Sequence, residues 1–83
     1  MDRLSFNKLS DQVFDEIQKA EIKHPIFPDN LVYKASLLSE ESGEASREAN
    51  FIVMENKESK EAFKKEVTQV ACICFRILES MEE

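Results

Sequence analysis

Apolar residues recur at intervals of three and four along three separate stretches of the chain, which is the spacing of the buried face of an α-helix. The stretches run over about residues 5–23, 30–54 and 60–81. Between them the residues are mostly polar, or are prolines that an α-helix does not accommodate in its interior. The pattern therefore predicts three helices joined by two short connectors, and no strand.

The two connectors carry residues that end or begin helices. Two prolines lie in the first connector, residues 24–29, and each moves the residue before it away from helical backbone angles. Asp29 is predicted to cap the second helix. In the second connector, residues 55–59, Asn56 suits the left-handed conformation that ends many helices, and Ser59 is a candidate cap for the third helix.

Two of the three stretches carry the alternating four-and-three steps of a helix-bundle seam. The seam residues of the second stretch are Leu31, Ala35, Leu38, Ser42, Ala45, Ala49 and Ile52, and those of the third are Phe63, Val67, Val70, Cys74, Ile77 and Met81. The third stretch also carries apolar residues on its other faces. A helix that is apolar all round needs burial on several sides, so we expect an all-α, three-helix chain whose bundle is completed by homo-oligomerisation.

The composition narrows the classes of function. The 83 residues are expected to form one domain, residues 1–83, with a net charge of −6 that does not attract the backbone of a nucleic acid. No apolar run approaches the roughly 18 residues of a membrane span. Cys72 and Cys74 cannot pair with each other on one helix and are expected to be free thiols. A cytoplasmic protein without nucleic-acid or membrane partners is predicted.

Four glutamates crowd into nine positions of the second stretch: Glu40, Glu41, Glu44 and Glu48. Like charges three and four residues apart repel each other by a few tenths of a kcal/mol per pair. Tyr33, Leu37 and Phe51 share this acidic face, and large apolar residues are unusual on a solvated face. Two interpretations remain open at this point, an acidic surface in water or a groove with apolar walls.

The third stretch supplies a second acidic piece, Glu66 followed by Gln69. If the second and third helices are antiparallel neighbours, this piece faces the glutamates near the middle of the bundle. Oxygen ligands from facing helices hold divalent metals inside helical bundles. A donor set of carboxylates without histidine favours Mg²⁺, with Mn²⁺ as the alternative, over zinc or iron.

These residues resemble the pattern E-E-x-x-E … E-x-x-D of the MazG-like all-α nucleoside triphosphate pyrophosphohydrolases. Here Glu40-Glu41-x-x-Glu44 is followed, 22 positions after Glu44, by Glu66-x-x-Gln69. The lead-in P-D-N-L-V-Y-K-A and the later K-E-V-T-Q-V-A are also similar, so the resemblance covers about residues 25–79. The resemblance implies an all-α bundle that forms a homodimer or homotetramer and uses magnesium to cleave a (d)NTP into the monophosphate and pyrophosphate.

The resemblance also implies roles for individual residues. Glu41, Glu44 and Glu66 match the core metal ligands, and Glu40 matches the leading acid, to which a water-orienting catalytic role is carried over. The fourth ligand position holds Gln69 in place of the family's Asp, and an amide oxygen binds metal without supplying charge. This departure keeps a second function open, a non-catalytic relative that binds nucleotide or metal or acts as an oligomerising interaction protein.

Three further residues are candidates for substrate binding. Phe27 either lines a ligand pocket or plugs the end of the bundle. Lys57 and Arg76 could contact phosphate groups, or they could be solvated and structural charges.

Overall fold

The computed structural model describes residues 1–82, which form three α-helices and no strand. The helices are α1 (Arg3–Lys23), α2 (Leu31–Met54) and α3 (Glu61–Ser80). The all-α prediction is confirmed, and each helix boundary lies within two residues of the predicted one. Over the described residues, no helix combines the length and the apolar character needed to cross a membrane.

Side-chain caps explain where the first two helices begin. The Asp2 carboxylate accepts a hydrogen bond of 2.8 Å from the backbone N–H of Ser5, which starts α1 earlier than its apolar pattern indicates. The Asn30 side chain accepts a bond of 3.0 Å from the N–H of Tyr33. Asn30 is therefore the cap of α2, and the prediction that Asp29 has this role is wrong.

The second connector ends α2 in the way that its residues predict. Asn56 has a φ angle of 52°, in the left-handed region. The backbone N–H of Lys57 donates a hydrogen bond of 2.9 Å to the carbonyl of Ile52. A backbone group therefore caps the end of α2. Ser59 lies one residue before the cap position of α3, and its hydroxyl accepts a bond of 3.4 Å from the N–H of Glu61.

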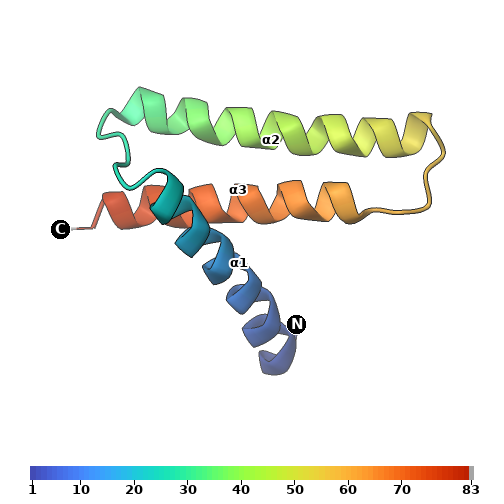
Figure 1. Cartoon of the computed structure of the whole chain (residues 1–83), viewed down its shortest axis with the longest axis horizontal. Coiled ribbons are helices and arrows are strands. Elements are labelled where there is room, and N and C mark those ends of the chain that lie inside the picture. The colour runs from blue at the N-terminus through green and yellow to red at the C-terminus, as the bar shows by residue number, and fades with distance from the viewer. Residues whose placement is uncertain (83) are drawn as a thin grey trace.

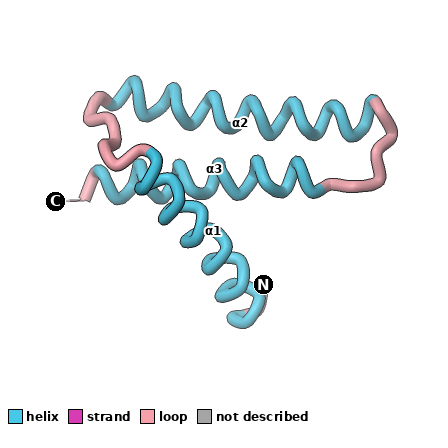
Figure 2. The backbone as a smooth tube through the Cα atoms, viewed as in Figure 1, coloured by secondary structure: helices cyan, strands magenta, loops and turns pink. Residues whose placement is uncertain are grey.

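α2 and α3 lie side by side as an antiparallel hairpin, and α1 crosses α3 and then diverges from it (Figure 1). α1 packs against α3 but not against α2. The two connectors lie at opposite ends of the hairpin (Figure 2). The half of α1 that precedes its crossing with α3 therefore projects away from the rest of the chain.

The face of α2 that meets α3 is rotated from the predicted seam. Ala45 is buried as expected, but Leu31 is 67% exposed while Lys34 is only 5% exposed. In a straight α-helix, positions seven residues apart are rotated by about 20° relative to each other. A seam predicted from a strict seven-residue repeat therefore drifts away from the face that contacts the neighbouring helix. The least exposed stripe of α2 begins at Lys34 and passes through half-buried Glu41.

A single chain buries few apolar side chains. Ala45 and Cys72 are the buried hydrophobic residues within residues 1–82, whereas Phe6, Phe14 and Phe75 are each about half exposed. The accessible surface is 6793 Å². A compact monomer of 9.6 kDa exposes about 5,100 Å² by the usual scaling of area with mass. The chain is thus more open than a self-sufficient globular domain.

Candidate metal centre

Three carboxylates converge between α2 and α3. Glu41 and Glu44 lie one turn apart on α2, Glu66 lies opposite them on α3, and each offers an oxygen within 4.8 Å of the other two. Such a triangle has a point within about 2.8 Å of all three oxygens, whereas ligand distances are about 2.0–2.6 Å for Mg²⁺ and Ca²⁺. A contraction of about half an ångström would bring the three oxygens to ligand distance.

The electrostatics of this triad (Glu41, Glu44 and Glu66) are those of like charges held together. Partial burial, followed by the negative charges of Glu44, Glu66 and Glu40, raises the pKa of Glu41. Partial burial also raises the pKa of Glu66, and the charge of Glu44 and a hydrogen bond shared with it add to the increase. The protein therefore gains from a proton or a cation at this place.

We expect Glu66→Gln to stabilise the metal-free protein selectively at neutral pH. The folded-state pKa of Glu66 is raised, so the stability linked to its protonated form is present below about pH 4.5 and is lost as the pH rises through the folded value. The variant keeps a neutral side chain throughout and should be more stable by a few tenths of a kcal/mol at pH 7. Urea unfolding in a chelating buffer at pH 4 and pH 7 measures this difference. A variant less stable than the wild type at pH 7 would contradict it.

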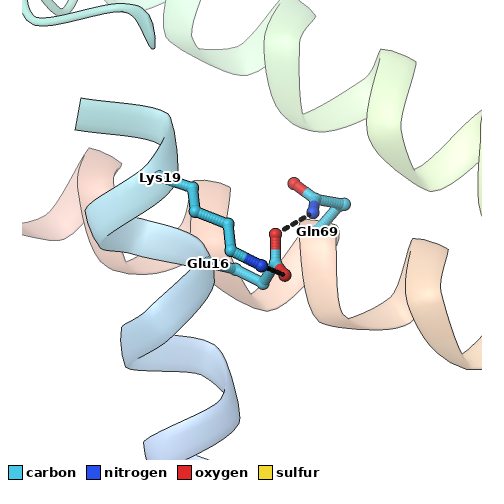
Figure 3. Close-up of polar contacts among 3 residues, drawn as sticks. All are labelled: Glu16, Lys19 and Gln69. Atoms are coloured by element: carbon cyan, nitrogen blue, oxygen red, sulfur yellow. Dashed lines mark hydrogen bonds and ion pairs between the residues drawn. The ribbon is translucent and has the colours of Figure 1, made fainter. Parts of the chain in front are cut away.

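Gln69, the fourth ligand candidate, is hydrogen-bonded to the first helix. Its amide nitrogen donates to a carboxylate oxygen of Glu16 at 2.8 Å, and Lys19 pairs with the other Glu16 oxygen at 3.2 Å (Figure 3). The amide oxygen of Gln69 points away from Glu16 (Figure 3). The hydrogen bond from Gln69 is the main reason that the pKa of Glu16 is lowered. Gln69 thus links α3 to α1, and its nitrogen is already engaged.

The surroundings of the triad are more open than a walled groove. Tyr33 is 58% exposed and Phe51 is 43% exposed, while Leu37 is half-buried. Of the two interpretations of the acidic face, a groove with apolar walls does not hold for one chain, because α1 packs on α3 and leaves that side of α2 uncovered. Glu40 is exposed beside the triad and is free to contact a molecule arriving from solvent.

Two of the substrate-binding candidates contact each other away from the triad. The Arg76 guanidinium lies 4.9 Å from the centre of the Phe27 ring and donates to the backbone carbonyl of His24 at 2.7 Å. These contacts fasten the first connector to α3. Lys57 lies in the other connector, at the opposite end of the hairpin, and pairs with Glu55 at 3.1 Å. The structure therefore does not bring Phe27, Arg76 and Lys57 together.

The cysteines are free thiols, as predicted. Cys72 is 1% exposed, and burial raises the pKa of its thiol. A protonated, enclosed thiol is neither a nucleophile nor a metal ligand at neutral pH. Cys72 is a core residue between the helices.

Two residues near the triad were not singled out from the sequence. Glu16 lies beside Ile17 at the edge of the apolar stripe of α1, three residues after Val13, and this position is the signal that could have marked it. Lys34 lies seven residues before Glu41, on the same face of α2, and its stem is buried. The side chain of Lys34 forms no hydrogen bond or ion pair within residues 1–82, and its ammonium group reaches solvent past the buried stem.

Comparisons with protein-family models, with curated proteins and with solved structures find no match to this chain.

Proposed function

We propose that the chain is a divalent-metal-dependent nucleoside triphosphate pyrophosphohydrolase of the MazG-like kind. The observation that supports this most is the convergence of Glu41 and Glu44 with Glu66, which comes from another helix and lies 22 residues further along the chain than Glu44. These are the positions of the core metal ligands in the resembling pattern. A solvated acidic face has no need to gather carboxylates from two helices, because their charges repel.

The donor set fits magnesium or manganese. All three groups are carboxylates, and at half-buried positions they leave room for water and for phosphate oxygens. Such an ion would supply charge stabilisation to the phosphate group under attack. In the proposed reaction a water oxygen bonds to the α-phosphorus, the bond from that phosphorus to the α–β bridging oxygen breaks, and pyrophosphate leaves. Glu40, exposed beside the triad, would orient that water and accept its proton.

The proposed enzyme contains at least two copies of the chain. The exposed apolar side chains of α1 and α3 are those that a bundle with too few helices leaves uncovered. A homodimer or homotetramer would cover them and would also confine the nucleotide, since Tyr33 and Phe51 do not enclose the acidic face in one chain. The buried thiol of Cys72 suits a reducing compartment such as the cytoplasm.

The hydrogen bond between Gln69 and Glu16 favours a second candidate function. It uses the residue at the fourth ligand position as a contact between helices and brings no fourth charge to the metal. A relative with this arrangement could bind nucleotide or metal without turnover, or serve as an oligomerising interaction protein.

Incubation with each of the common NTPs and dNTPs plus magnesium, followed by separate assays of pyrophosphate and orthophosphate, tests the choice. Pyrophosphate release is expected, and it should disappear when a chelator is added. Orthophosphate alone would overturn the proposed bond cleavage, and the absence of both products would favour the non-catalytic candidate. The variant Glu58→Gln, which removes an exposed acid from the second connector, is the matched control and should keep wild-type activity.

A further inference from the structure

An open groove runs between α1 and the end of α3, and its lining does not include the triad. Phe14 and Ile17 of α1 line it together with Phe75 and Leu78 of α3. Phe14, Phe75 and Leu78 are each more than half exposed. Large aromatic and aliphatic side chains gathered along one groove mark a surface that binds another apolar surface.

The rim of this groove is acidic. Glu21, Glu79 and Glu82 lie along it, and the lining cation, Arg76, is engaged with the His24 carbonyl and the Phe27 ring. An occupant with apolar side chains on one face and positive charges beside them would match both the floor and the rim.

The first half of α1 has this chemistry. Phe6 and Leu9 lie three residues apart on one face, and each is nearly half exposed. Arg3 and Lys8 flank them. Figure 1 shows this part of the helix projecting away from α2 and α3, so its own chain does not cover it. The segment and the groove are complementary, but the segment is the first half of α1 and the groove is lined partly by the second half of the same straight helix, so the two cannot meet within one chain.

We propose that the first half of α1 of one copy docks in the groove between α1 and α3 of a second copy, and the reverse, about a two-fold axis. This assigns a surface to the homo-oligomer proposed above, and it rests on that oligomer and not on catalysis. With the two α1 helices antiparallel and the axis level with Gln12, Arg3 of each copy lies beside Glu21 of the other. One symmetric contact then covers both segments and both grooves.

The surface area is sufficient for such a dimer. The chain exposes about 1,700 Å² more than a compact monomer of its mass. A stable interface of standard size covers about 800 Å² on each partner. The excess on each chain is therefore larger than one such interface needs.

Sedimentation equilibrium of the full chain at micromolar concentration tests the proposal. The wild type should be oligomeric, and Phe6→Asp should raise the dissociation constant at least about tenfold, because it places a charge in the apolar groove. Val53→Asp, at an apolar position of α2 that is more exposed than Phe6, is the control and should leave the constant unchanged. A monomeric wild type would overturn both the oligomer and this surface. An oligomeric wild type with Phe6→Asp at the wild-type constant would overturn the surface and leave the oligomer standing.

A charge reversal provides a second test that does not alter the apolar residues. Arg3→Glu with Lys8→Glu should weaken association about tenfold and keep α1 folded, since acidic residues near the beginning of a helix are favourable. Adding Glu21→Lys and Glu79→Lys to the same chain should restore the association of the two copies. If association stays weak in this quadruple variant while circular dichroism shows that the helix content is retained, the proposed docking of the first half of α1 in the groove is overturned. Both tests measure the molar mass of the assembly, so the outcome of the pyrophosphate assay does not affect them.

Discussion

Glu44→Gln is expected to weaken magnesium binding by about 100-fold or more and to abolish metal-dependent release of pyrophosphate. Glu44 is the central member of the triad, because its charge contributes to raising the pKa values of both Glu41 and Glu66. A carboxylate in that position would contact any cation that Glu41 and Glu66 bind together. The amide of Gln keeps the size of the side chain and removes the charge. Isothermal titration with MgCl₂ measures the loss of affinity, and the pyrophosphate assay measures the loss of turnover.

Stability separates this result from a folding defect. Removing one of three repelling carboxylates should leave the metal-free protein at least as stable as the wild type. Magnesium should raise the melting temperature of the wild type and of Glu58→Gln but not that of Glu44→Gln. Magnesium affinity that stays at the wild-type value in Glu44→Gln would contradict the assignment of the triad as a metal centre.

The parts of the site that follow from one helix or from one pair of helices could be predicted from the sequence. The spacing of Glu41 and Glu44 places both on one face of α2, and an antiparallel partner then brings Glu66 opposite them. The helices themselves follow from apolar spacing and from the two connectors. These predictions depend on local geometry, which the order of the residues determines.

The parts that depend on how α1 packs could not be predicted in the same way. The crossing of α1 over α3 brings Glu16 to Gln69, which lies 53 residues later, and no local rule sets the angle of that crossing. The same arrangement leaves Tyr33 and Phe51 exposed. The predicted seam of α2 is wrong for a related reason, since a small rotation of the helix decides whether Leu31 or Lys34 faces α3.

Gln69→Asp is expected to change metal affinity and stability in opposite directions. A fourth carboxylate beside the triad should tighten magnesium binding by about tenfold, because charge count is a main determinant of affinity in oxygen-ligand sites. The same change removes the hydrogen bond that Gln69 donates to the Glu16 carboxylate at 2.8 Å and sets two carboxylates against each other. Loss of a partly exposed, charge-assisted bond should lower the stability of the metal-free protein by about 1–2 kcal/mol.

Gln69→Asn is the matched control for this prediction. It shortens the side chain by the same one methylene group and adds no charge, so it should lose stability without gaining affinity for magnesium. Titration calorimetry and urea unfolding of both variants separate the two effects. If Asp and Asn at position 69 bind magnesium equally well, the residue is not a ligand, and its role is the contact with Glu16. If only Asp tightens binding, the glutamine is a neutral replacement at a genuine fourth ligand position, and the chain has exchanged metal affinity for a link between α1 and α3.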